Sequence, residues 1–119
     1  MNIHESAENY LETIMLLSQR DEPVRSIDIA NHLGFAKPSV SIAMKNLREN
    51  GYISMDTNGH IILKPKGEKI AKMMLERHTL LTNWLVSLGV PDEIAVKDAC
   101  RIEHVISEES FDAIKKRLK

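Results

Sequence analysis

The chain has 119 residues and a mass of 13.5 kDa, which leaves room for one compact domain or two small ones and excludes a large multidomain enzyme. Aromatic residues make up only 4% of it, so aliphatic side chains must fill the core, and this favours packed helices. Residues 37–72 carry seven basic and three acidic side chains, a net charge of +4, whereas residues 89–112 carry two basic and seven acidic ones, a net charge of −5. The middle of the chain therefore suits an anionic partner, and the later segment attracts cations.

The cysteine content and the N-terminus indicate a reducing compartment. The single cysteine, Cys100, cannot form a disulfide within the chain, and the polar, acidic start is unlike a secretory signal. The apolar stretch 80–90 is interrupted by polar residues and falls far short of the ~18 unbroken apolar residues of a membrane span. We therefore expect a cytoplasmic protein without a membrane anchor.

Two helices are predicted before residue 35. Apolar residues at helical spacing predict a helix over residues 3–17, with Glu8 and Glu12 on its polar flank. Ser26 is expected to cap a short second helix, which Gly34 ends.

A third helix and a hairpin follow. Pro38 in the first turn is expected to open a helix that ends at Gly51. Residues 52–57 and 60–63 are strand-like and are separated by Asn-Gly, the strongest short signal for a hairpin. A two-stranded wing is therefore predicted.

The rest of the chain is predicted to be helical. A long apolar-periodic segment over 70–88 stops at Gly89, and Pro91 starts another helix that runs to about residue 105. Ser107, followed by two glutamates, is a capping sequence for a short last helix.

A short helix, a turn with glycine, a second helix and a hairpin form the winged helix-turn-helix, whose second helix lies in the DNA major groove. The first residues of the 38–50 helix would meet base edges or phosphates, and the basic residues along it would mainly hold the DNA backbone. An alternative is that its basic residues are only the solvated face of an amphipathic helix, but the order of the three elements and the local basic excess favour DNA binding. The candidate DNA-binding residues are Arg25, Ser26, Lys37, Pro38, Ser39, Ser41, Lys45, Arg48 and Lys64.

A second group of candidate functional residues lies on the helix predicted over 91–105. Cys100, Glu103 and His104 stand at i, i+3 and i+4, so they share one helical face. Thiolate, carboxylate and imidazole together form a pocket suited to a divalent cation. Taken singly, each has an ordinary explanation, such as a small core residue for the cysteine. Other helices offer further candidate ligands: Asn9, Glu12 and His78.

The chain resembles the metal-dependent repressors typified by the diphtheria toxin repressor and the manganese transport regulator. The resemblance covers nearly the whole length and rests on AENYLETI, IDIANHL, KPSVSIAMKNL, LKPKGEKIA, RHTLL and DACRIEHVIS. It implies a mainly α protein, with a winged helix-turn-helix DNA-binding domain over 1–72 and a helical metal-binding and dimerisation domain over 73–119. It also implies a homodimeric repressor that takes Fe²⁺ or Mn²⁺ as corepressor and then binds operator DNA of metal-homeostasis genes.

The resemblance also implies which residues bind the metal. The family's ligands fall on Asn9, Glu12, His78, Cys100, Glu103 and His104. The site is a hybrid, because Cys100 matches the iron type and Glu12 the manganese type, while Asn9 replaces the Met of the one and the Asp of the other. Thr82 and Val96 stand where the iron type has ligands of an accessory site, which weakens that site here. The thiolate favours Fe²⁺ over Mn²⁺.

Other classes of protein remain to be weighed. A metal-free winged-helix regulator could use Cys100 to sense oxidants or a partner. A zinc hydrolase is disfavoured, because no nucleophile elbow or substrate pocket accompanies the cluster, and we expect no enzyme. Dimerisation is expected from a surplus of apolar residues on the 70–88 helix, although a thicker internal core would explain them equally. These residues are Leu80, Leu81, Trp84, Leu85 and Leu88.

Overall fold

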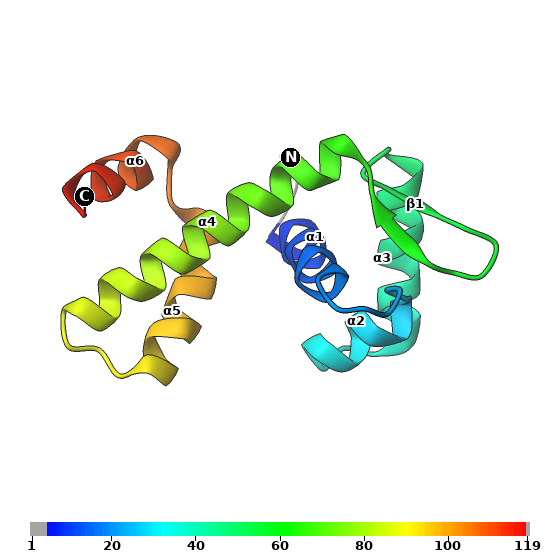
Figure 1. The fold of residues 1–119 in the computed structure, drawn as a ribbon, viewed down its shortest axis with the longest axis horizontal. Helices are drawn as coiled ribbons and strands as arrows, with labels where there is room; N and C mark the ends of the chain where they lie inside the picture. The colour runs from blue at the N-terminus through cyan, green and yellow to red at the C-terminus, as the bar shows by residue number, and fades with distance from the viewer. Residues whose placement is uncertain (1–4, 119) are drawn as a thin grey trace. The chain divides into compact units, whose positions relative to one another are not determined.

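The computed structural model describes residues 5–118. These residues form six helices and one two-stranded antiparallel sheet (Figure 1), which confirms the mainly α prediction. The chain divides into two compact units with the boundary between Lys72 and Met73. That boundary falls inside the longest helix, α4 (Pro65–Ser87).

The first unit is a winged helix-turn-helix, as predicted. It contains α1 (Glu5–Ser18), α2 (Ser26–Leu33), α3 (Lys37–Glu49), β1 (Ile53–Met55), β2 (Ile61–Leu63) and the start of α4. The first residues of the predicted 3–17 helix lie outside the described part of the chain. Aliphatic side chains from every one of these elements form the core, among them Leu11, Ile14, Ile29, Val40, Met44, Ile53, Ile61 and Ala71.

The turn between α2 and α3 is made by a glycine in the left-handed region. Gly34 has a φ of 72°, and the amides of Gly34 and Phe35 both donate to the carbonyl of Ala30, at 2.8 and 3.0 Å. The prediction that Ser26 caps α2 is wrong. Arg25 occupies the cap position, and its amide donates to the Asp28 carboxylate at 2.9 Å, so Ser26 is already the first helical residue.

The wing is shorter than predicted, and its turn is longer. Ile53 pairs with Leu63 and Met55 with Ile61, so five residues rather than two connect the strands. The Asp56 carboxylate accepts hydrogen bonds from the amides of Asn58 and His60, at 2.8 and 2.9 Å. Because this carboxylate organises the turn, Gly59 is the only residue among 56–60 with a positive φ, whereas the two-residue turn typical of Asn-Gly needs two such residues.

Helix α4 begins five residues earlier than predicted. Pro65 is its first residue, where a missing amide proton costs nothing, and Gly67 continues it. A Cβ on Gly67 would lie 2.2 Å from the Tyr52 carbonyl oxygen and 3.2 Å from a Leu11 methyl group. The glycine is therefore required by a tertiary contact and does not end a loop.

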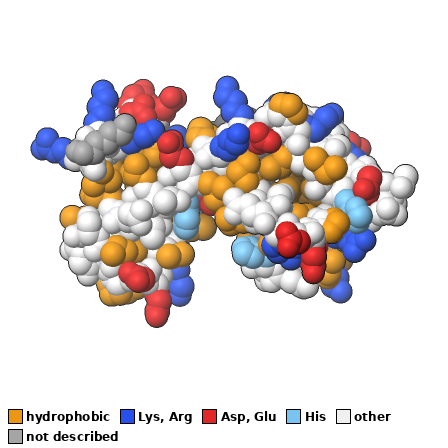
Figure 2. Space-filling model, in the orientation of Figure 1, with side chains coloured by type: hydrophobic (Ala, Val, Ile, Leu, Met, Phe, Trp, Pro, Cys, Tyr) orange, Lys and Arg blue, Asp and Glu red, His pale blue; other side chains and the backbone are white. Residues whose placement is uncertain are grey.

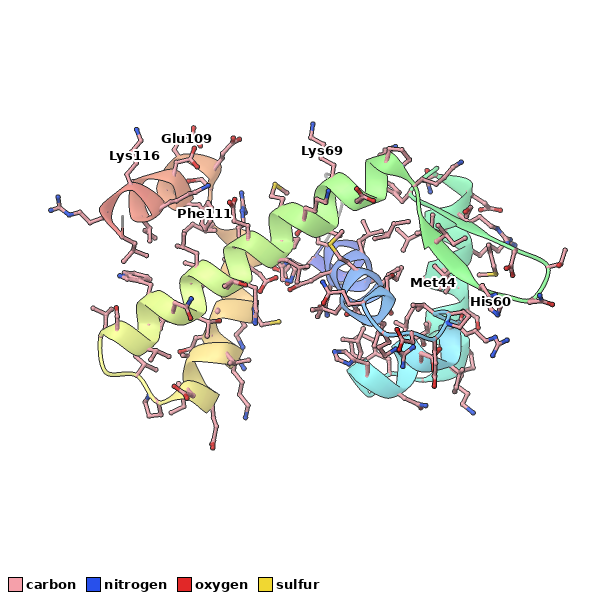
Figure 3. The ribbon with its side chains drawn as sticks, in the orientation of Figure 1. Met44, His60, Lys69, Glu109, Phe111 and Lys116 are labelled. Carbon is pink, nitrogen blue, oxygen red and sulfur yellow. The ribbon has the colours of Figure 1, made fainter. Side chains whose placement is uncertain are left out.

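The second unit contains the remainder of α4, with α5 (Asp92–Val105) and α6 (Glu108–Arg117). Its core is formed by Leu81, Ala99 and Phe111, and Phe111 points from α6 toward α4 (Figure 3). The Ser107 hydroxyl accepts a hydrogen bond from the Ser110 amide at 3.0 Å, which confirms the predicted cap. Leu81 is fully buried in this core, so it does not belong to the apolar surplus expected on the surface of α4.

Candidate metal centre and nucleic-acid interface

Three candidate ligands converge on one face of α5. One potential ligand atom from each of Cys100, Glu103 and His104 lies within 4.8 Å of the other two. The helix itself produces this convergence, because residues at i, i+3 and i+4 are neighbours on its surface. The prediction that the three residues share a face is confirmed by this geometry.

Glu103 is the centre of the cluster. It is fully buried, and its Oε1 accepts a hydrogen bond from Nδ1 of His78 at 2.7 Å. His78 lies on α4, so this bond brings a fourth candidate ligand to the group on α5. The exposed fraction of the His78 side chain is 27%, which leaves its ring partly accessible while its Nδ1 faces the carboxylate.

Within residues 5–118, the second carboxylate oxygen of Glu103 accepts no hydrogen bond, although it is buried. Its neighbour is Nε2 of His104, at 3.8 Å, and the His104 side chain is only 5% exposed. Buried polar atoms in native proteins almost always have a partner. A carboxylate, two imidazoles and a thiol around such an atom fit a divalent transition metal.

Hydrogen bonding controls the protonation of His78. Its bond to the Glu103 carboxylate raises the pKa of the His78 imidazole, burial opposes the shift, and the negative charge of Glu103 adds to it. The Glu103 carboxylate therefore favours positive charge on His78, where a bound metal ion would also place positive charge.

Arg77, on α4, stabilises the end of α5 that carries the cluster. Sequence reasoning missed this residue. Its Nη1 donates to the carbonyl oxygens of Glu103 and Ile106, at 3.0 and 3.1 Å, and its guanidinium lies 5.5 Å from the centre of the Phe111 ring. This buried cation holds the C-terminal turn of α5, from which Glu103 and His104 project. The signal in the sequence was an arginine directly before His78, in the middle of a long helix with apolar periodicity.

The two remaining candidate ligands lie in the first unit, on α1. Asn9 is half-buried there. Glu12 is one of the buried residues of the helix, so the alternative in which it only lies on a solvated helix face is wrong.

The candidate DNA-binding residues lie on the first unit, mostly on α3. Val40, Met44 and Leu47 face the core from this helix, and the periodicity that buries them turns the opposite face outward. All the candidates except the half-buried Ser26 are exposed: Arg25, Lys37, Pro38, Ser39, Ser41, Lys45, Arg48 and Lys64. Sequence reasoning missed Ile42, which is 64% exposed at the middle of the same face.

Two family models match the chain, one for each part. Residues 2–61 match the N-terminal DNA-binding domain of iron-dependent repressors, and residues 64–119 match their metal-binding and dimerisation domain. The chain belongs to the iron-dependent repressor family. The resemblance predicted from the sequence motifs is thereby confirmed.

Relatives within this family are transcriptional regulators. The transcriptional regulator MntR of Salmonella typhimurium is 38% identical over 109 residues, which cover 92% of this chain and 69% of the relative. The HTH-type transcriptional regulator MntR of Lysinibacillus sphaericus is 36% identical over 109 residues, covering 92% of this chain and 78% of the relative.

Solved structures of the family share the fold. The manganese regulator SloR superposes with a TM-score of 0.85 at 27% identity, covering 99% of this chain and 54% of that one. A manganese-dependent transcriptional repressor in complex with manganese gives a TM-score of 0.87 at 26% identity, covering 94% and 52%. The chain thus spans about half the length of these structures.

None of the helices in residues 5–118 combines the length and the apolar character needed to cross a membrane.

Proposed function

We propose that this chain is a metal-dependent transcriptional repressor, which binds Fe²⁺ or Mn²⁺ as corepressor and then binds operator DNA as a homodimer. Residues 1–72 would form the DNA-binding domain, and residues 73–119 the metal-binding and dimerisation domain. The observation that carries the proposal is the buried Glu103 carboxylate, with His78 bonded to one oxygen and His104 beside the other.

The proposed ligands come from both units. His78, Cys100, Glu103 and His104 project from α4 and α5, while Asn9 and Glu12 project from α1. A bound divalent cation would supply the positive charge that a buried carboxylate and a thiolate lack. An ion bound by ligands from both units would hold the two units together. This would favour the dimer geometry in which two copies of α3 reach major grooves ~34 Å apart.

Metal affinity is predicted to increase with pH. The raised pKa of His78 means that the metal-free site keeps its proton to a higher pH, and the Cys100 thiol must also lose a proton before it can coordinate a metal. Below the pKa of a ligand, the metal affinity falls about tenfold for each unit by which the pH decreases, for every proton that the metal must displace. Mn²⁺ titrations from about pH 6 to about pH 8 test this, and an affinity independent of pH would contradict the assignment of these ligands.

DNA binding is predicted to depend on the basic face of α3. Lys45 is exposed there. Loss of one phosphate contact reduces the magnitude of the negative slope of log affinity against log salt concentration by about 0.9. We expect Lys45→Ala to bind duplex DNA about tenfold more weakly, as measured by fluorescence anisotropy at several salt concentrations. The control is Lys97→Ala, which removes an equal, exposed charge from α5; an equal loss in both variants would refute a specific role for α3.

Ile42 would contribute to sequence preference rather than to phosphate binding. An exposed aliphatic side chain between basic and hydroxyl-bearing residues is costly in water. In a major groove it can contact the methyl group of thymine. We therefore assign Ile42 to base recognition.

The second unit is proposed to form the dimer. Hydrophobic side chains reach its surface at the left of Figure 2, and Leu88, Ile94 and Val105 are between 51% and 70% exposed. A groove of about 660 Å³ along α4 is lined in part by Leu80 and Trp84. We predict a dimer by gel filtration at two protein concentrations, and a monomer at both would exclude the model with two half-sites.

A further inference from the structure

The turn of the wing is tied to the beginning of α2 by a short series of polar side chains. His60, at the wing hairpin (Figure 3), uses Nδ1 to contact Oδ2 of Asp56 at 3.1 Å. Its Nε2 lies 2.9 Å from Nη2 of Arg25, and Nε of Arg25 donates to the Asn58 carbonyl oxygen at 3.4 Å. The backbone is joined at the same place, because the Ile61 amide donates to the Val24 carbonyl oxygen at 2.7 Å.

These contacts define how the His60 ring is used. Arg25 can only donate hydrogen bonds, so Nε2 of His60 must be the acceptor and Nδ1 must carry the proton that faces Asp56. The Asp56 carboxylate is itself fixed. The hydrogen bond from the His60 amide is the main cause that holds the pKa of Asp56 below its usual range. It outweighs the opposing effect of burial, and the bond from the Asn58 amide lowers the pKa further. The carboxylate therefore remains an acceptor at neutral pH.

Arg25 is held in place while its side chain remains exposed. Its guanidinium has five donors, and the bonds to the wing use two of them. The Arg25 amide is bonded to Asp28, whose carboxylate also pairs with Arg20 at 3.6 Å. The result is a cation fixed between the wing and the first turn of α2, on the unit that carries α3. A long side chain that is already ordered loses less entropy on binding than a mobile one.

We propose that His60 is a positioning residue for DNA binding, which holds the Arg25 guanidinium at the junction of the wing and α2, ready to contact a DNA phosphate. The inference rests on the proposed function, since it assumes that the first unit binds DNA. His60 itself touches no DNA in this account and acts through Arg25.

Two substitutions at His60 separate positioning from simple packing. The amide oxygen of His60→Gln reaches the place of Nε2 and can accept from Arg25, whereas the shorter His60→Asn reaches only the place of Nδ1. With Mn²⁺ present, and with a duplex that the wild-type chain has enriched from a randomised library, we expect His60→Asn to bind about fivefold more weakly. His60→Gln is expected to stay within about twofold of the wild type.

A double-mutant cycle shows whether the effect passes through Arg25. In an Arg25→Met background, His60→Asn is expected to cause no further loss, because the group that it positions is gone. Equal losses in the Asn and Gln variants, or an undiminished effect of His60→Asn in that background, would overturn the inference. If the wild-type chain enriches no duplex at all, the proposed function itself fails, which is a distinct result.

Discussion

Glu103→Gln is expected to lower the affinity of the chain for Mn²⁺ or Fe²⁺ by about 100-fold or more. Glu103 is fully buried, accepts the hydrogen bond from His78 and has its other oxygen beside His104. The amide has nearly the same size but lacks the negative charge, and its nitrogen cannot coordinate as a carboxylate oxygen does. Isothermal titration calorimetry under anaerobic conditions measures the loss.

The matched control for this substitution is Glu93→Gln on the same helix. Glu93 is an exposed acid in the first turn of α5, so its loss changes the net charge equally but leaves the cluster intact. We expect its metal affinity to stay within about threefold of the wild type. If Glu103→Gln binds metal as tightly as the wild type, the metal site lies elsewhere in the chain, whatever the result for Glu93→Gln.

Gly67→Ala is expected to destabilise the first unit by about 1–3 kcal/mol, although alanine favours helices over glycine. The added Cβ would lie 2.2 Å from the Tyr52 carbonyl oxygen, and a backbone atom cannot move away as the end of a flexible side chain can. The start of α4 would have to separate from the end of α3 and the wing. Urea unfolding followed by circular dichroism measures the change in the free energy of unfolding.

The control for Gly67→Ala is Lys69→Ala, two residues further along α4. Lys69 is exposed and points away from its helix into solvent (Figure 3), so its replacement should change stability by no more than about 0.5 kcal/mol. If Gly67→Ala were as stable as this control or more stable, the close approach of α4 to Tyr52 would be wrong.

The elements were predictable where local rules determine them. Apolar periodicity together with Gly34, Pro38 and Ser107 identified helices and boundaries, because caps and glycine turns depend on a few neighbouring residues. The cluster on α5 was predictable for the same reason, since i, i+3 and i+4 spacing requires only that the segment be helical.

Contacts between distant residues account for what was missed. The Asp56 carboxylate reorganises a turn whose Asn-Gly sequence favours a tighter one. The earlier start of α4 reflects the fit of Gly67 against Tyr52. The bond from Arg77 to the carbonyl of Glu103 spans 26 residues, and that between Arg25 and His60 spans 35, and no spacing rule for a single helix or strand predicts such pairs.

The most direct measurement is the affinity of the wild-type chain for its enriched duplex, determined by fluorescence anisotropy without oxygen, first with a chelator and then with Mn²⁺ or Fe²⁺. A metal switch with a typical coupling energy of 1–3 kcal/mol predicts DNA binding that is roughly 5-fold to 150-fold tighter with metal. That gain should be absent in Glu103→Gln. Equal affinity of the wild type with chelator and with metal would show that its DNA binding does not depend on the centre around Glu103.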